Sequence, residues 1–318
     1  MPSTIDVVIV AYNRFDLTES CLRHLQAQTL AHQLIVIDNG STDGTSTHLR
    51  ERWPQAKVER FEDNRGFAEA CNRGVAAGSG EFIVLLNNDV DCRPDFLERL
   101  VAPLERDASI GSVAALLLQP SGESIDSIGL CADRTLAGFP RLQGLPAASA
   151  GDPHPILSCP AGAAAAYRRT AWQAAGSLDE TIFAYMEDFD FGLRLRTAGW
   201  RAVAAPDAVG IHLGSATHGH RSAWQRRHAG FSRGYLLRRY RLLRGRQALR
   251  TLLTEAIVVL GDLYISRDLA ALRGRATGWR AAQGLPALEP PPAEAIDASI
   301  GLRDSLALRR GVYGRRAA

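Results

Sequence analysis

The first two hundred residues alternate between short apolar runs and amphipathic segments. The predicted strands cover residues 5–11, 34–37, 58–61, 82–86 and 111–118. An uninterrupted apolar run such as 82–86 is typical of a strand buried on both faces, as in a parallel sheet covered by helices. Apolar residues at helical spacing between these runs predict helices at 16–28, 45–52, 67–77 and 94–105. This alternation predicts an α/β fold with a doubly wound, mostly parallel sheet flanked by helices.

The pattern changes after residue 118. Residues 119–157 are rich in turn residues and predict a loop with short strands. Beyond them we expect a helix over 185–198 and two short strands at 202–204 and 209–212. The chain is therefore expected to divide into three parts, which are an α/β domain at 1–218, a basic helical extension at 219–283, and a proline-rich linker and tail at 284–318.

Composition narrows the class of protein. The chain has 46% hydrophobic and 22% charged residues, which is typical of a globular protein. Its five cysteines are scattered without a CxxC pair, which favours a reducing compartment over a disulfide framework or a zinc site. No secretory signal pattern and no run of about 18 apolar residues is present, so we expect a cytoplasmic protein.

Charge is distributed unevenly along the chain. Residues 1–207 carry 18 basic and 27 acidic side chains, whereas residues 208–318 carry 19 basic and 7 acidic ones. The basic helices could be a solvated face, a homodimer element, or a surface for anionic lipid at the inner face of the plasma membrane. In the lipid interpretation the interleaved aromatic residues are Trp224, Phe231, Tyr235 and Tyr240. Nucleic acid is disfavoured as a partner, because the rest of the chain is acidic.

Polar clusters follow most of the predicted strands. The clusters are Tyr12-Asn13, Asp38-Asn39, Asn64-Arg65-Gly66, Asn87 to Asp91, Glu187-Asp188 and His212. In a doubly wound sheet such clusters converge at the carboxyl ends of the strands, where ligands bind. Each cluster alone could be an ordinary turn or helix cap. Carboxylates and amides such as Asp89, Asp91 and Asn87 are also hard oxygen ligands suited to Mg²⁺ or Mn²⁺ with a diphosphate.

The set of motifs resembles a known enzyme family. The stretches VVIVAYNR, VIDNGSTDGT, DNRGFAEACNRG, FIVLLNNDV, FAYMEDFDFGLRLRTAGW and HLG occur in order between residues 5 and 215. They are similar to the inverting family-2 glycosyltransferases with a GT-A fold, and within them to the bacterial rhamnosyltransferase-like branch. The resemblance implies that residues 1–218 form a catalytic domain binding a dTDP- or UDP-linked sugar and a glycan or lipid-linked acceptor, in the synthesis of cell-surface polysaccharide.

The resemblance also assigns residues to the donor nucleotide. Asp38 is expected to accept a hydrogen bond from the base, although it could instead cap the turn that follows it. The other expected nucleotide contacts are Ala11, Tyr12, Asn13, Arg14, Asn64, Arg65, Gly66, Asn72, Asn87 and Asn88. Arg65 and Asn72 could equally be exposed side chains without a role in binding.

The metal site and the base follow from the same resemblance. Asp89 is the expected main ligand of Mg²⁺ or Mn²⁺, with Asp91 and His212 as further ligands. The family's usual first aspartate is Asn87 here, which contributes an oxygen but no charge. Asp188 is the expected general base, and Glu187 is the second carboxylate of the pair.

The rival interpretations are another enzyme class, either a nucleotidyltransferase or a dinucleotide-binding oxidoreductase, and a degenerate member of the same family. A dinucleotide-binding oxidoreductase would need GxGxxG after the first strand, where this chain has Tyr12-Asn-Arg-Phe15. A degenerate, non-catalytic member that binds nucleotide or membrane would account for Asn87.

Overall fold

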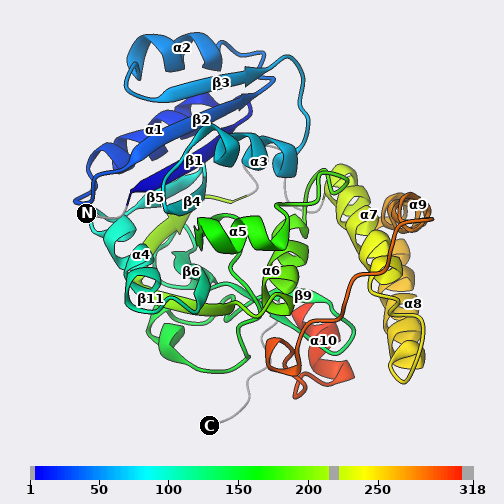
Figure 1. The fold of residues 1–318 in the computed structure, drawn as a ribbon. Coiled ribbons are helices and arrows are strands. Elements are labelled where there is room, and N and C mark those ends of the chain that lie inside the picture. Colours follow the sequence, from blue (N-terminus) through cyan, green and yellow to red (C-terminus); the bar gives the residue numbers. More distant parts are fainter. Residues whose placement is uncertain (1–3, 215–221, 310–318) are drawn as a thin grey trace.

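A mixed sheet forms the centre of the molecule (Figure 1). The computed structural model describes residues 4–214 and 222–309. Among them the strands of the main sheet run in the order β3-β2-β1-β4-β10-β6-β11-β5, and β7 pairs with β6. Their bounds are β1 Ile5–Ala11, β2 Gln33–Asn39, β3 Lys57–Phe61, β4 Phe82–Asn87, β5 Val90–Cys92, β6 Ile110–Leu118, β7 Ile125–Ser127, β10 Ala164–Arg168 and β11 Arg201–His212.

Most strands of this sheet run in the same direction. Strands β1, β2, β3 and β4 run in the same direction, as do β6 and β11. Strand β10 is antiparallel to both β4 and β6, and so joins the two parallel groups. The expected α/β fold is confirmed, with the carboxyl ends of β1, β2 and β4 at one edge.

Helices cover both faces of the sheet. One apolar core contains side chains of α1 (Phe15–Gln26), α2 (Thr45–Arg52) and α4 (Phe96–Arg106). The core on the opposite face contains side chains of α3 (Phe67–Ala77), α5 (Arg169–Ala175) and α6 (Glu187–Thr197). Buried strand residues contact both cores, which explains why the strands read as continuous apolar runs.

The turn-rich insert and strand β11 differ in detail from the sequence-based expectation. The insert contains β7, the hairpin of β8 (Leu130–Ala132) and β9 (Gly138–Pro140), and the short helix η1 (Ala147–Gly151). Strand β11 is one continuous strand rather than two, because its pairing with β6 shifts register between Ala205 and Val209 and resumes. The shift falls at Pro206 and Asp207, between the two segments that were expected as separate strands.

The basic extension forms three helices beside the sheet (Figure 1). They are α7 (Ala223–Arg239), α8 (Ala248–Ser266) and α9 (Ala270–Ala281). Glycines of α7 and α9, such as Gly230 and Gly278, lie against backbone of the other helix and leave no room for a Cβ. No helix in the described part of the chain is long and apolar enough to cross a membrane. The expected domain boundary at residues 218 and 219 lies outside the described residues.

The aromatic residues of α7 pack inward. Tyr235 and Tyr240 are buried in a core with residues of α6, and Trp224 and Phe231 are partly buried. The idea that these aromatic side chains form a lipid-facing surface is therefore wrong for α7. The sequence identified these aromatic residues on a helix, but it did not show whether protein or solvent lies against them.

The segment expected to be a linker and tail packs against the body. Ser158 Oγ donates to the carbonyl of Ala295, and Asp297 N donates to the carbonyl of Ala132. A short 3-10 helix, η2 (Ala293–Ala295), and α10 (Leu302–Leu308) lie in this segment. Residues 284–309 thus connect the extension back to the insert.

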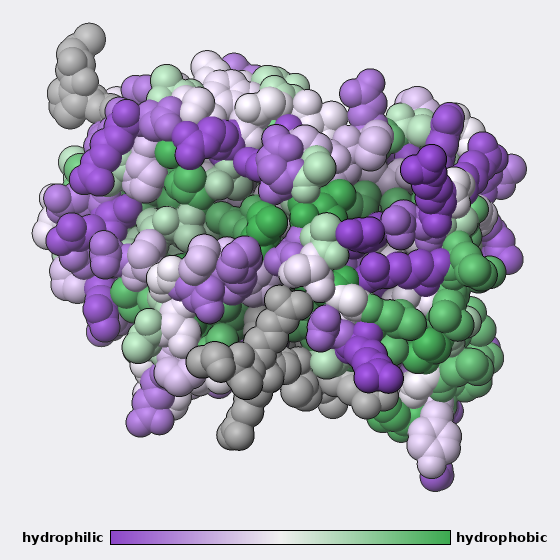
Figure 2. Space-filling view, turned by 90° about the horizontal axis from the view of Figure 1, so that it is seen from below, coloured by the Kyte–Doolittle hydropathy of each residue, from purple (hydrophilic) through white to green (hydrophobic). Residues whose placement is uncertain are grey.

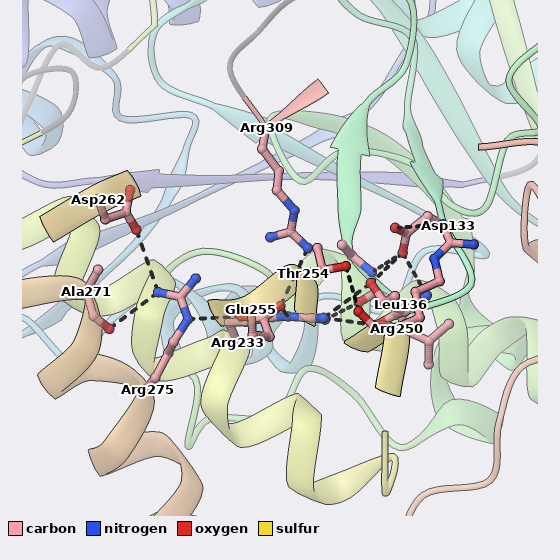
Figure 3. Close-up of polar contacts among 12 residues, drawn as sticks. Asp133, Leu136, Arg233, Arg250, Thr254, Glu255, Asp262, Ala271, Arg275 and Arg309 are labelled. Carbon is pink, nitrogen blue, oxygen red and sulfur yellow. Dashed lines mark hydrogen bonds and ion pairs between the residues drawn. The ribbon is translucent and has the colours of Figure 1, made fainter. Parts of the chain in front are cut away.

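A buried ion-pair network joins α8 to its neighbours (Figure 3). Glu255 lies between Arg233 of α7, at 2.8 Å, and Arg275 of α9, at 3.0 Å. Arg309, directly after α10, lies 3.5 Å from the same carboxylate. Burial alone would raise the pKa of Glu255, but the charges of these arginines lower it to about 2. The carboxylate of Glu255 in α8 therefore joins this helix to α7, to α9 and to the end of α10.

Candidate active site

Three of the predicted polar clusters meet at the carboxyl edge of the sheet, those of Asn87 to Asp91, Glu187-Asp188 and His212. The backbone of Asn87, at the end of β4, is tied to the loop before β10, since Asn87 N donates to Ala163 O at 2.9 Å. The neighbouring Gly162 N donates to Asp188 Oδ2 at 2.6 Å. Leu213 N, directly after β11, donates to Asp89 O at 3.0 Å. These contacts connect the segments of the predicted metal ligands to the loop that holds the carboxylate of the predicted base.

Asp89 and His212 form the pair that fits a divalent metal ion. His212 Nε2 lies 3.4 Å from Asp89 Oδ1, and that oxygen is buried without a hydrogen-bond partner. A carboxylate oxygen and an imidazole nitrogen are a suitable donor set for Mn²⁺. Within residues 4–214 and 222–309, no group of three or more His, Cys, Asp or Glu side chains converges as a metal cage. Substrate phosphates and water would complete the coordination, as is usual for Mg²⁺.

Asp126 orients His212 from behind. Asp126 Oδ2, in β7, lies 2.8 Å from His212 Nδ1. Burial lowers the pKa of His212, but the hydrogen bond to Asp126 and the negative charges of Asp89 and Asp126 outweigh it and raise the pKa to about 10. Ligating histidines commonly use their second nitrogen in this way, which fixes the ring and its tautomer. Asp126 lies in the turn-rich insert, where the sequence has no motif that would have identified it.

Asp91 lies apart from this pair. Its Oδ1 accepts a hydrogen bond from Ser20 of α1 at 3.0 Å and lies 3.7 Å from His24 Nε2. The structure therefore brings Asp89 and His212 together and places Asp91 against α1. A role for Asp91 in metal binding would require its side chain to leave these partners.

Two asparagines complete the end of β4. Asn87 Oδ1 is buried and has no hydrogen-bond partner, so its oxygen is available to a ligand. Asn88 Nδ2 donates to Thr18 Oγ1 of α1 at 2.9 Å. The oxygen of Asn87 thus has no partner within the described residues, whereas Asn88 anchors the turn.

Glu187 and Asp188 begin helix α6. Asp188 accepts hydrogen bonds from the N–H groups of Gly162 at 2.6 Å and Phe189 at 2.7 Å. Burial raises the pKa of Asp188, and these hydrogen bonds oppose the rise. Burial and the charge of Asp188 raise the pKa of Glu187 to about 8, and Glu187 Oε2 is buried without a partner. The two N–H donors favour the charged form of Asp188, whereas nothing donates to Glu187 Oε2, so Glu187 is the member of the pair that favours the neutral form.

The turn before this pair is strained and braced by α7. Tyr185 and Met186 both have positive φ, at 67° and 68°, a conformation that non-glycine residues adopt at a cost. The ring of Tyr185 contacts Trp224 of α7, with centroids 6.0 Å apart. Tyr240, just after α7, donates to Asp190 Oδ1 at 3.2 Å. The basic extension thus supports the turn that places Asp188.

The loops after β1 and β2 are joined on the expected nucleotide side. Asn13 Oδ1 accepts from Thr42 N at 2.9 Å, and Asn13 N donates to Ser41 Oγ at 2.8 Å. Asp38 Oδ1 accepts from Ser41 N at 2.9 Å, so Asp38 does cap its turn. The second oxygen, Oδ2, is buried without a hydrogen-bond partner. That oxygen lies 3.8 Å from Arg60 Nε, and Asp38 is fully buried, so a base could reach it only if the side chains around it moved.

The remaining residues of the first loop differ in exposure. Ala11 is buried at the end of β1, and Tyr12 is partly exposed. Arg14 is exposed, pairs with Asp16 at 2.8 Å and precedes helix α1 in a left-handed conformation. Among these residues, Asn13 combines partial exposure with hydrogen bonds to the loop after β2.

Asn39, which sequence reasoning left without a role, fixes the turn after β3. Its Nδ2 donates to Asn64 Oδ1 and Gly66 O, both at 3.1 Å, and its Oδ1 accepts from Arg65 N at 2.9 Å. Gly66 has φ 92°, and a Cβ there would lie 2.6 Å from Phe183 O. The Arg65 side chain points to solvent with Glu69 at 3.1 Å, so phosphate binding would require it to turn inward.

Asn72 braces a different loop. Its Nδ2 donates to Leu178 O at 3.0 Å and its Oδ1 accepts from Leu178 N at 3.0 Å. A cavity of about 1020 Å³ lies here, lined by residues of β3, α3 and the loop 176–181, including Arg60 and Arg65. Neither Asp89 nor Asp188 lines this cavity.

Comparison with known proteins agrees with this geometry. The model of Glycosyl transferase family 2 matches residues 6–128, and that of Glycosyl transferase family group 2 matches residues 141–275. N-acetylglucosaminyl-diphospho-decaprenol L-rhamnosyltransferase of Mycobacterium tuberculosis is 27% identical over 249 residues, covering 67% of this chain and 76% of that protein. O-antigen biosynthesis protein RfbC of Myxococcus xanthus is 27% identical over 234 residues, covering 67% of this chain and 17% of that protein.

Solved structures show the same fold. Mannosyltransferase PcManGT from Pyrobaculum calidifontis, in complex with GDP-Man and Mn²⁺, aligns with TM-score 0.51 at 18% identity, covering 89% of this chain and 76% of that one. GalNAc-T7 with UDP, GalNAc and Mn²⁺ aligns with TM-score 0.57 at 16% identity, covering 80% and 54%. The chain belongs to the family-2 glycosyltransferases, with a GT-A fold and a similarity to their rhamnosyltransferase-like branch.

Proposed function

We propose that this glycosyltransferase moves L-rhamnose or another hexose from a dTDP- or UDP-linked donor to a lipid-linked glycan, with inversion, in cell-surface polysaccharide synthesis. The observation that carries the proposal is Asp188, a carboxylate held by two backbone N–H groups at the edge that also holds Asp89 and His212. The printed name of the mycobacterial relative, a diphospho-decaprenol L-rhamnosyltransferase, supports the sugar and the acceptor class.

In the proposed reaction the residues of this chain divide the work. Asp188 takes the proton from the acceptor hydroxyl as its oxygen attacks the anomeric carbon. Neutral Glu187 beside it keeps the pair at a single negative charge, so Asp188 is the member free to accept that proton. Asp38 and Asn13 hold the nucleoside at the ends of β2 and β1. Because the base lies on the acceptor's side, displacement in one step inverts the anomeric configuration without an enzyme nucleophile.

Asp89 and His212 would hold the divalent ion, with the oxygen of Asn87 available beside them. When bound, Mn²⁺ or Mg²⁺ neutralises the charge that develops on the departing diphosphate. Asn87 in place of an aspartate reduces the charge of this site by one, which also favours the alternative of a non-catalytic member that binds nucleotide.

A thermal-shift screen tests the donor and the metal together. The protein is heated with UDP, dTDP or GDP, each with Mn²⁺, Mg²⁺ or EDTA. A nucleotide at about 100 times its Kd stabilises the fold by about 2.7 kcal/mol, which raises Tm by several degrees. We expect a shift with dTDP or UDP that EDTA removes. A lack of any shift, or an equal shift in EDTA, would contradict the metal-dependent donor site.

Replacing Asp126 with asparagine tests how His212 is oriented. The amide keeps the size of the side chain but removes the charge that holds the Nδ1 proton. We expect the Kd for Mn²⁺ to rise by about 10–100-fold, the usual cost of losing such an outer partner. Electron paramagnetic resonance of free Mn²⁺ measures this without any assay of activity.

Asp91→Asn is the matched control for this experiment. Asp91 lies on the same short segment as Asp89 but contacts Ser20 and His24, so we expect the variant's Kd for Mn²⁺ to stay within about twofold of the unmodified protein's. A larger effect of Asp91→Asn than of Asp126→Asn would show that Asp91, rather than the Asp126–His212 pair, belongs to the metal site.

A further inference from the structure

Helix α8 presents its apolar side chains to solvent. Leu249 is 77% exposed, Leu260 64%, Tyr264 85% and Ile265 73%. The other exposed apolar side chains on this helix are Leu252, Leu253, Ile257 and Leu263. Their spacing of three or four residues places most of them along one face. Figure 2 shows a continuous hydrophobic area at the side of the molecule where α8 lies in Figure 1.

The polar side of the same helix faces the protein. Thr251, Thr254 and Glu255 are buried, and Glu255 is held by Arg233 and Arg275 (Figure 3). Rotating α8 to hide its leucines would break these buried ion pairs. The outward direction of the apolar face is therefore fixed by the network, and the helix is inverted relative to an ordinary surface helix.

Soluble monomers rarely expose apolar patches of this kind, and those that do use them to bind a partner or a membrane. The charges around α8 distinguish between such partners. Exposed arginines bracket the helix, with Arg241, Arg244 and Arg246 before it and Arg267 and Arg273 after it. The nearby carboxylates are engaged, because Asp262 lies 3.8 Å from Arg275 and Asp268 pairs with Arg226. The apolar face thus lies between two cationic ends.

We propose that α8 docks on an anionic lipid surface, with its leucines in the acyl boundary and the flanking arginines among the headgroups. An apolar face bordered by arginines is the composition of helices that lie in the membrane interface, where anionic lipid attracts the cations. A highly exposed tyrosine such as Tyr264 fits the same boundary. The inference deepens the proposed function, since it names the surface that would bring the site to a lipid-linked acceptor.

A second copy of this chain fits the face less well. A symmetric dimer would pair α8 with α8 of the other copy in a parallel or an antiparallel arrangement. Both arrangements bring an arginine-bearing end of one helix against an arginine-bearing end of the other, because both ends are cationic. Like charges facing each other across an interface oppose association.

Vesicle co-sedimentation of the full chain tests the proposal. The vesicles contain phosphatidylcholine alone or phosphatidylcholine mixed with phosphatidylglycerol, at low ionic strength. We expect binding to the mixed vesicles, and a decrease of at least about tenfold in the partition coefficient for the double variant Leu252→Ser and Leu260→Ser. Arg244→Gln with Arg246→Gln should weaken binding to mixed vesicles and make it less sensitive to salt.

Leu285→Ser is the matched control, because Leu285 is 44% exposed but lies outside α8; it should leave the partition coefficient unchanged. Absence of binding to mixed vesicles, or binding that the double serine variant retains, would overturn the proposal. A dimer in light scattering that this variant dissociates would do the same and would assign the face to a second copy.

The docking surface and the proposed function can fail separately. The two leucines are exposed and distant from the site, so the double variant should keep the nucleotide-dependent thermal shift and its turnover of a short, water-soluble acceptor. Loss of the thermal shift in the unmodified protein would instead count against the donor site and leave the vesicle result unaffected.

Discussion

Asp188→Asn is expected to lower kcat by about 10²–10⁴-fold, the usual contribution of a general base. The amide has nearly the shape of the carboxylate but cannot take the proton from the acceptor. One amide oxygen can still accept from Gly162 N or Phe189 N, so the start of α6 should persist. The affinity for donor nucleotide should stay within a few fold, since Asp188 contacts neither Asp38 nor Asp89. Single-turnover kinetics and calorimetric titration of nucleotide measure the two quantities separately.

Glu187→Gln is the matched control for the base. Because the pKa of Glu187 is raised to about 8, the side chain is neutral at pH 7, and glutamine resembles that form. We expect kcat at pH 7 to fall by less than about tenfold. If Glu187→Gln were the more damaging of the two changes, the roles of the two carboxylates would have to be exchanged.

Glu255→Gln is expected to lower the free energy of unfolding by about 3–5 kcal/mol, as is typical when one partner of a buried ion pair is removed. The change leaves Arg233, Arg275 and Arg309 close together without their shared carboxylate. Urea denaturation of the variant and the unmodified protein measures the difference. Glu69→Gln is the control, because Glu69 pairs with Arg65 at the surface and its loss should cost less than about 1 kcal/mol.

Acid should produce the same loss in the unmodified protein. The pKa of Glu255 is lowered from 4.5 to about 2 on folding, so its stabilisation is complete above pH 4.5 and disappears as pH falls through 2. This shift corresponds to about 3 kcal/mol, at about 1.4 kcal/mol per pKa unit. Between pH 5 and 2 the Glu255→Gln variant should therefore lose less stability than the unmodified protein. Parallel pH profiles for the two proteins would contradict the shared role of Glu255.

The sheet and its helices could be predicted because each buried element carries its own pattern. The strand 5–11 and the helices 45–52 and 67–77 have the predicted bounds in the structure. The apolar residues of these elements pack into the two cores that flank the sheet, so the periodicity of the sequence matches the burial in the structure. Prediction failed where contacts with other elements decide which face of a helix is buried. Tyr235 and Tyr240 are interleaved with arginines, as in a lipid-facing helix, but they pack on α6, and the apolar face of α8 is exposed instead.

Residues of the candidate site could be predicted where a polar motif stands at the end of a predicted strand. The strands and the helix next to Asp89, Asp188 and His212 end at the same edge of the sheet. The order of the elements along the chain therefore predicts that these three residues lie near one another. Asp126 and Gly162 lie in segments without periodicity, and their contacts arise from tertiary pairing of β7 with β6 and of residue 163 with β4. The direction of a side chain was equally inaccessible, as Asp91 shows by contacting α1.

The anomeric configuration of the product tests the central claim most directly. The nucleotide identified by the thermal-shift screen defines the donor, and nuclear magnetic resonance of the purified product gives the configuration of the new bond. We predict a configuration opposite to that of the donor, in a product that forms with Mn²⁺ or Mg²⁺ and is lost in EDTA. A product with retained configuration, or one formed equally well in EDTA, would contradict metal-dependent inversion with Asp188 as the base.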